Sequence, residues 1–214
     1  MRRYNLMGTA LCAGVLALWG SGAQAEEFSA RLDGFQELGS LPNVTQNPTT
    51  GAVTAANPTG AILSDGKGTV SLNLHKGAGT VDYTLTYSNV GATPPLTGTV
   101  TQAHIHFGKA RDSGGILVFF CTNLTPPVGP PTPPKCPLNS GTVTGTLTKA
   151  DVVLISGQNV VAGDFDALED ALTSNTAYAN IHTTALGAGE IRGQIHRGDL
   201  DEKHDHHDDD HDHK

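Results

Sequence analysis

The chain is poor in charged and aromatic side chains. Of its 214 residues, 16% are charged and 5% are aromatic, whereas glycine alone occurs 26 times. No basic patch is visible, so we expect no nucleic-acid partner. Abundant glycine and recurrent threonine are typical of a β-rich extracellular domain and disfavour a helical one.

Several catalytic motifs are missing as well. The sequence contains no Gly-x-Ser-x-Gly nucleophile elbow and no glycine-rich phosphate loop. Nothing singles out a second acid that could work beside Glu190 as a catalytic pair. We therefore assign no catalytic residue and favour a binding protein over an enzyme.

The apolar segment at the N-terminus is too short and too often interrupted by glycine for a membrane helix. It runs from about Leu6 to Trp19, after the basic residues Arg2 and Arg3, and small residues at 23–25 resemble a signal peptidase site. We therefore predict a signal peptide over residues 1–25, a mature chain without a membrane span, and a periplasmic or secreted location.

Cysteine is scarce. One of the three cysteines, Cys12, lies in the N-terminal apolar segment, which leaves Cys121 and Cys136 in the mature chain. An even pair in an oxidising compartment predicts a disulfide, here across a proline-rich loop. The alternative is a pair of thiolate metal ligands, which is disfavoured because an exported thiol pair tends to oxidise.

Residues 198–214 form a separate tail of histidine and aspartate. From Asp199 to the C-terminus the chain has eight acidic residues and two lysines. Such a composition cannot build a core and predicts disorder. Its imidazoles suggest a loose chelator of divalent metal ions, the alternative being a solubilising tail; the histidines are His204, His206, His207, His211 and His213.

Alternating apolar and polar residues predict strands over most of the remaining domain, residues 26–197. The predicted strands cover residues 28–33, 70–75, 81–88, 99–107, 116–121, 142–148, 178–183 and 190–196. The segment 149–155 is ambiguous between strand and helix. Only residues 165–172 have helical spacing, with Asp164 as N-cap. The fold class expected is all-β, an antiparallel β-sandwich or barrel-like domain with one short helix near 165–172.

Three histidines stand out within these strands. His104 and His106 are two residues apart and therefore share a strand face, opposite Ile105. With His182 they could supply three neutral imidazoles to copper or zinc, and Glu190 and His196 are candidates for a further ligand or a supporting partner. The alternative is that the histidines hydrogen-bond backbone and threonine hydroxyls. The polar faces lie opposite the apolar ones, so we expect these histidines to be free to act as ligands.

Six segments together resemble the CHRD domain, a module named after chordin and also found alone in bacterial exported proteins. They are residues 28–37, 83–87, 103–108 (Ala-His-Ile-His-Phe-Gly), 114–118, 178–183 and 189–194 (Gly-Glu-Ile-Arg-Gly-Gln). The chain departs from the family pattern after Glu37, where a Pro-Pro step is usual, and in the proline-rich loop. The resemblance implies an all-β, sandwich-like domain and does not imply a settled activity.

The sequence therefore predicts an exported CHRD-domain binding protein, with a copper- or zinc-binding histidine site and a metal-chelating tail. Its expected partners are divalent metal ions. An alternative is an extracellular protein-interaction or matrix module in which the histidines are structural, with another extracellular protein as partner. A third class, a metal-dependent redox enzyme, would need the same metal and an open coordination position.

Overall fold

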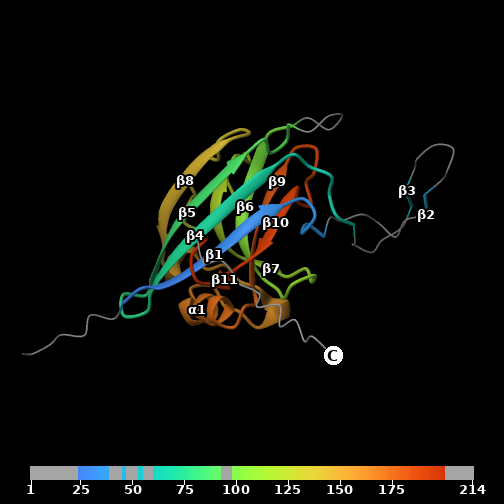
Figure 1. Cartoon of the computed structure of the whole chain (residues 1–214). Helices are drawn as coiled ribbons and strands as arrows, with labels where there is room; N and C mark the ends of the chain where they lie inside the picture. Colours follow the sequence, from blue (N-terminus) through green and yellow to red (C-terminus); the bar gives the residue numbers. More distant parts are fainter. Residues whose placement is uncertain (1–23, 39–44, 47–52, 55–59, 93–97, 201–214) are drawn as a thin grey trace, which may run out of the picture.

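One long antiparallel sheet forms the body of the protein (Figure 1). The computed structural model describes residues 24–38, 45–46, 53–54, 60–92 and 98–200. The strand order is β7-β6-β9-β10-β1-β4-β5-β8, with β11 also paired to β1. The strands are β1 (Glu26–Asp33), β4 (Lys67–His75), β5 (Thr80–Ser88), β6 (Val100–Phe107), β7 (Gly115–Thr122), β8 (Gly141–Leu147), β9 (Ala177–Thr183), β10 (Ile191–Gln194) and β11 (His196–Arg197).

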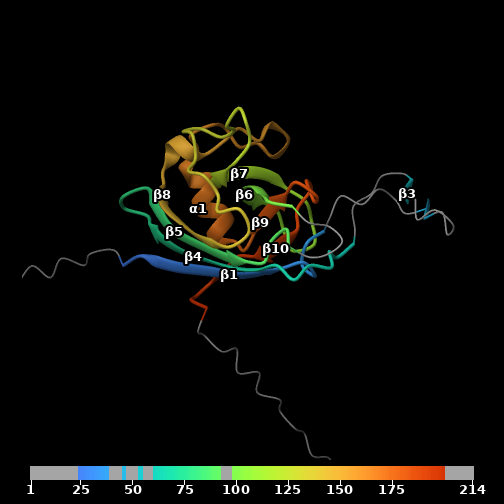
Figure 2. The same ribbon diagram turned by 90° about the horizontal axis from the view of Figure 1, so that it is seen from above.

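The sheet curls into a nearly closed barrel, which Figure 2 shows from above. Strands β4 and β5 alternate strictly between buried and less buried residues, so one face of each packs inward. Their inward side chains, such as Leu72 and Leu85, pack with Phe28 of β1 and Phe120 of β7 in the core. The barrel thus encloses a continuous apolar interior.

Strands β7 and β8 stand at the two ends of the strand order, and no strand pairing joins them in the described part of the chain. Tyr83 of β5 bridges this seam. Its hydroxyl donates a hydrogen bond to the Phe120 carbonyl at 2.9 Å, and its ring lies 4.9 Å from the Phe120 ring. Gly145 of β8 leaves the room for that ring, because a Cβ there would approach the Tyr83 ring to 2.8 Å.

The one α-helix in the described part of the chain, α1 (Phe165–Thr173), closes one end of the barrel (Figure 1). Its N-cap is Asp164, whose carboxylate accepts a hydrogen bond from the Ala167 amide. Leu168, Ala171 and Leu172 are buried in the core. Two short 3-10 turns precede the helix (Lys149–Asp151 and Ser156–Gln158), and β2 (Thr45–Gln46) and β3 (Val53–Thr54) form a separate two-stranded ribbon.

The structure confirms the fold class predicted from the sequence, including the short helix and its N-cap. The Cys121–Cys136 disulfide is also present. One strand is divided: the segment predicted over 190–196 breaks at Ile195, whose side chain turns into the core, so β10 and β11 are separate. The ambiguous segment 149–155 begins with a 3-10 turn.

Two predictions concern residues that the structure does not describe. The predicted signal peptide, residues 1–25, falls almost wholly within residues 1–23, and the histidines of the tail fall within residues 201–214. Among the described residues, no helix has the length and apolar character needed to cross a membrane.

Candidate metal centre

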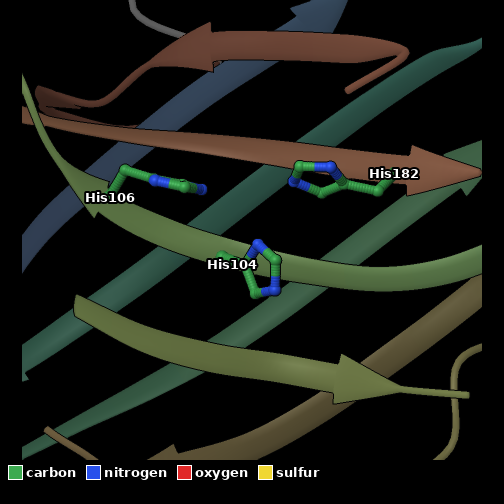
Figure 3. A group of neighbouring side chains, drawn as sticks. All are labelled: His104, His106 and His182. Carbon is green, nitrogen blue, oxygen red and sulfur yellow. The ribbon is translucent and has the colours of Figure 1, made fainter. Parts of the chain in front are cut away.

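The strand register brings His104, His106 and His182 together from two neighbouring strands. In the antiparallel pair β6–β9, His104 faces Asn180 and His106 faces Tyr178. His182 lies two residues beyond Asn180 on the same strand, so its side chain points to the same side. Figure 3 shows the three imidazoles gathered in front of these two strands.

Their ring nitrogens are close enough to share a metal ion after a small adjustment. One nitrogen from each histidine lies within 4.8 Å of the others. Three nitrogens bound at about 2.0 Å in trigonal or tetrahedral geometry stand roughly 3.3–3.5 Å apart. The rings would therefore move together by about 1 Å, which modest side-chain rotations can supply.

The site is buried, contrary to the expectation that the polar faces of these strands leave the histidines free. His104 is 0% exposed, His106 8% and His182 7%, and every residue of β9 is buried. The outer face of β6 and β9 is approached by loops, since Gly114 and Gly187 hydrogen-bond these histidines. A ligand set that looked solvent-facing in the sequence is thus a desolvated one.

Two of the three histidines are oriented by backbone carbonyls. His106 Nδ1 donates to the Gly114 carbonyl at 2.9 Å, and His182 Nδ1 donates to the Gly187 carbonyl at 3.0 Å. A carbonyl can only accept, so in the neutral rings the proton sits on Nδ1 and Nε2 keeps its lone pair. This arrangement is typical of metal-ligating histidines, whose second nitrogen is held by a carbonyl or carboxylate.

The remaining nitrogens are short of partners. Both nitrogens of His104 and Nε2 of His106 are buried without a hydrogen-bond partner. The ring of His104 instead meets the Phe119 ring edge-on, with centroids 4.6 Å apart. Leaving a buried polar atom unpaired costs about 1–3 kcal/mol, so these atoms require an explanation, and a bound cation is one.

Asn180 adds an oxygen beside the triad. Its Oδ1 lies 3.1 Å from Nε2 of His182, whose other nitrogen already faces the Gly187 carbonyl. A neutral His182 ring has one N–H proton, but its two nitrogens face two oxygens, those of Gly187 and Asn180. Rotation of the Asn180 amide, or a metal ion bound at Nε2, would remove the unfavourable contact between Nε2 and Asn180 Oδ1.

Burial keeps all three rings neutral. Desolvation lowers the pKa of His106 to about 4, lowers that of His182, and lowers that of His104 well below its usual range. The neighbouring His182 and His106 lower the pKa of His104 further, whereas the Asn180 side chain acts in the opposite direction. Because only unprotonated imidazole binds a metal, the triad stays competent to bind one in mildly acid solution.

A column of side chains stands beside the triad. The Tyr178 ring stacks on the His106 ring at 4.7 Å with an interplanar angle of 3°, and the Arg192 guanidinium lies 3.4 Å from the Tyr178 ring centroid. Arg192 is anchored by donating to the carbonyls of Lys109 and Asp112. A positive charge is therefore fixed on the far side of Tyr178.

Glu190 and His196 do not join the cluster. The buried Glu190 carboxylate accepts hydrogen bonds from the Gly91 amide and the Ser64 hydroxyl, so it ties the turn before β10 to two distant segments. His196 is exposed and pairs in register with Ser29 of β1. The structure thus brings together His104, His106 and His182, without the two further candidates.

Some of the residues that support the triad could be predicted from the sequence, and others could not. Asn180 and Tyr178 precede His182 by two and four residues, so strand periodicity placed them on its face. Phe119 gave no signal, because it reaches His104 only through register shifts between β6 and β7. The positions of the Gly114 and Gly187 carbonyls depend on loop conformation, which no periodic sequence pattern predicts.

Comparison with known proteins supports the motif-based resemblance at the level of the domain. No curated protein and no solved structure matched the chain. The comparison with protein families matched residues 28–195 to the CHRD domain, a span that includes the whole histidine triad and most of the barrel. The chain therefore belongs to the CHRD domain family.

Proposed function

We propose that this CHRD domain is an exported metal-binding protein that holds one copper or zinc ion through His104, His106 and His182. The observation that carries the proposal is the convergence of three buried, neutral imidazoles, each with a ring nitrogen within 4.8 Å of the others, and with unpartnered nitrogens on His104 and His106. Such nitrogens suit copper and zinc.

Each part of the surroundings has a role in this proposal. The Gly114 and Gly187 carbonyls hold His106 and His182 in the tautomer that presents Nε2. Burial excludes competing water and opposes protonation. A bound ion would supply positive charge to atoms that otherwise lack a partner.

The test is metal retention by the mature full-length chain with its five tail histidines replaced by alanine, which removes the tail as a competing chelator. After exposure to copper or zinc and desalting, we expect about one equivalent of metal by elemental analysis. His104→Ala/His106→Ala should abolish retention, whereas His75→Ala, a histidine outside the cluster, should leave it unchanged.

Equal retention by the double variant would refute the site. No retention by any form would favour the alternative, an interaction or matrix module in which the histidines only join strands and loops.

Export is the second element of the proposal. The disulfide between Cys121 and Cys136 supports an oxidising compartment. Expression with the native N-terminus followed by mass spectrometry of the periplasm and medium should give a chain that begins at Glu26. An intact N-terminus on a cytoplasmic product would contradict it.

The tail is proposed as a separate, low-affinity chelator. A synthetic peptide of residues 198–214 should release heat on titration with nickel, copper or zinc, because alternating imidazole and carboxylate offers many ligand subsets. Absence of heat with all three ions would leave the tail only a solubilising role.

A further inference from the structure

We infer that the histidine triad selects the monovalent ion Cu(I) over the divalent ions Cu(II) and Zn(II). The inference rests on the proposed function and adds the charge state of the ion. It follows from three features of the site: an uncharged ligand set, deep burial, and a fixed positive charge nearby.

The ligand set carries no negative charge. The cluster consists of three histidines, and no carboxylate belongs to it among the residues that the structure describes. Removing an ion from water costs a free energy that grows with the square of its charge, so a divalent ion loses about four times as much as a monovalent one. At a site 0–8% exposed and without an anion to compensate, this difference favours the monovalent ion.

The positive charge of Arg192 also favours a monovalent ion over a divalent one. Its guanidinium stands behind Tyr178, 3.4 Å from that ring, and Tyr178 stacks on His106. Glu37 and Asp112 interact electrostatically with Arg192, but neither carboxylate belongs to the histidine cluster. A unit charge at roughly 10 Å and an effective dielectric constant of about 20 changes affinity by about tenfold per unit of ion charge.

Coordination number points to the same ion. Zn(II) sites are four-coordinate and Cu(II) prefers a tetragonal set, so both need ligands beyond the triad. One candidate is the neutral Asn180 Oδ1, 3.1 Å from His182 Nε2, an oxygen that adds no charge. Cu(I) accepts three nitrogen ligands without a fourth.

The experiment compares affinities for Cu(I), Cu(II) and Zn(II) by competition with chromophoric chelators, with Cu(I) measured anaerobically. It uses the mature full-length chain with alanine at the five tail histidines. We expect the wild-type triad to bind Cu(I) most tightly. Asn180→Asp, a nearly isosteric change, places a carboxylate 3.1 Å from His182 Nε2 and should lower the ratio of Cu(I) to Cu(II) affinity by roughly tenfold or more.

Asn159→Asp is the matched control, because it adds the same charge at an exposed position away from the triad and should leave the ratio unchanged. Tighter binding of Cu(II) or Zn(II) than of Cu(I) by the wild-type triad would overturn this inference while leaving the proposed function intact. Loss of all binding would instead refute the proposed function. Should Asn180→Asp fail to fold, the wild-type order of affinities still decides.

Discussion

At the scale of single residues, the histidines of the triad are not equivalent. His106 and His182 each donate one hydrogen bond to a loop carbonyl, whereas His104 has no hydrogen bond at either nitrogen. The first two therefore contribute to the metal-free fold as well as to the proposed metal site. His104 destabilises the metal-free fold, since burying a polar group without a hydrogen-bond partner is unfavourable.

Replacing these histidines by leucine should separate the two roles. His104→Leu should leave the free energy of unfolding of the metal-free protein unchanged or raise it, because an unpaired polar ring is removed. His106→Leu should lower it by about 1 kcal/mol or more, because the Gly114 carbonyl loses its donor. Urea unfolding measures both. A larger loss for His104→Leu than for His106→Leu would contradict the assignment.

The buried histidines also predict a pH dependence. An unfolded histidine has a pKa near 6.5, whereas burial holds all three lower in the folded protein, His106 at about 4. As pH falls below 6.5 the unfolded chain gains protons that the folded chain does not. The free energy of unfolding should therefore fall between about pH 6.5 and 4, by up to about 1.4 kcal/mol per pH unit for each histidine, and stay level above pH 7.

Denaturant unfolding of the metal-free protein at several pH values would measure this slope. His104→Leu/His106→Leu should make it shallower over the same range, since two of the titrating groups are gone. An unchanged slope in the double variant would show that other groups are responsible.

At the scale of elements, β6 and β9 form a platform that loops complete. Register shifts between β6 and β7 at Ala103/His104 and Ile105/His106 place Phe119 against His104 while Phe120 faces the core. The proline-rich loop follows the end of β7, and the Cys121–Cys136 disulfide ties the far end of the loop back to that strand. The Thr122 amide also donates a hydrogen bond to the Pro134 carbonyl. The disulfide thus anchors a segment that cannot form a ladder of its own.

Removing this disulfide should weaken the fold substantially. Cys121 and Cys136 are 15 residues apart and both buried, so Cys121→Ala/Cys136→Ala should lower the free energy of unfolding by about 3 kcal/mol. Urea unfolding of the variant, with reduced wild type as the control, measures the effect. A change below about 1 kcal/mol would mean that the loop is held mainly by its other contacts.

At the scale of the whole molecule, the barrel is closed by side chains where strand pairing ends. Tyr83 spans the seam between β7 and β8, and burial raises its pKa to about 12, so its hydroxyl stays protonated and able to donate. Only β7 separates the seam from β6, because β7 is the neighbour of β6 in the sheet. We therefore expect that opening the barrel at this seam would also disturb β6, the strand that carries His104 and His106.

Tyr83→Phe should open this seam. Loss of the hydrogen bond to the Phe120 carbonyl should cost about 1 kcal/mol and raise amide hydrogen exchange in β7 and β8. Tyr87→Phe is the control: it removes a hydroxyl from the same strand that donates to the Pro137 carbonyl, away from the seam contact. Equal exchange in the two variants would show that Tyr83 has no special part in closure.

Much of the fold follows from the sequence alone. Period-two alternation in segments such as 81–88 predicts a strand with one buried face. Helical spacing and the N-cap Asp164 predicted the helix at 165–172, which the structure has at Phe165–Thr173. The His-x-His pair and the position of His182 placed three candidate ligands on strand faces. These are local properties, which the order of neighbouring residues determines.

The tertiary structure decided what local order could not. Which strands are neighbours determines that His104 faces Asn180, and therefore that His182 joins the triad while Glu190 turns to Gly91 and Ser64. Loop conformation decides that the polar faces are buried and that two carbonyls orient the rings. The physical reason is that strand pairing and loop packing join residues some 80 positions apart, and their energies depend on contacts that no local pattern contains.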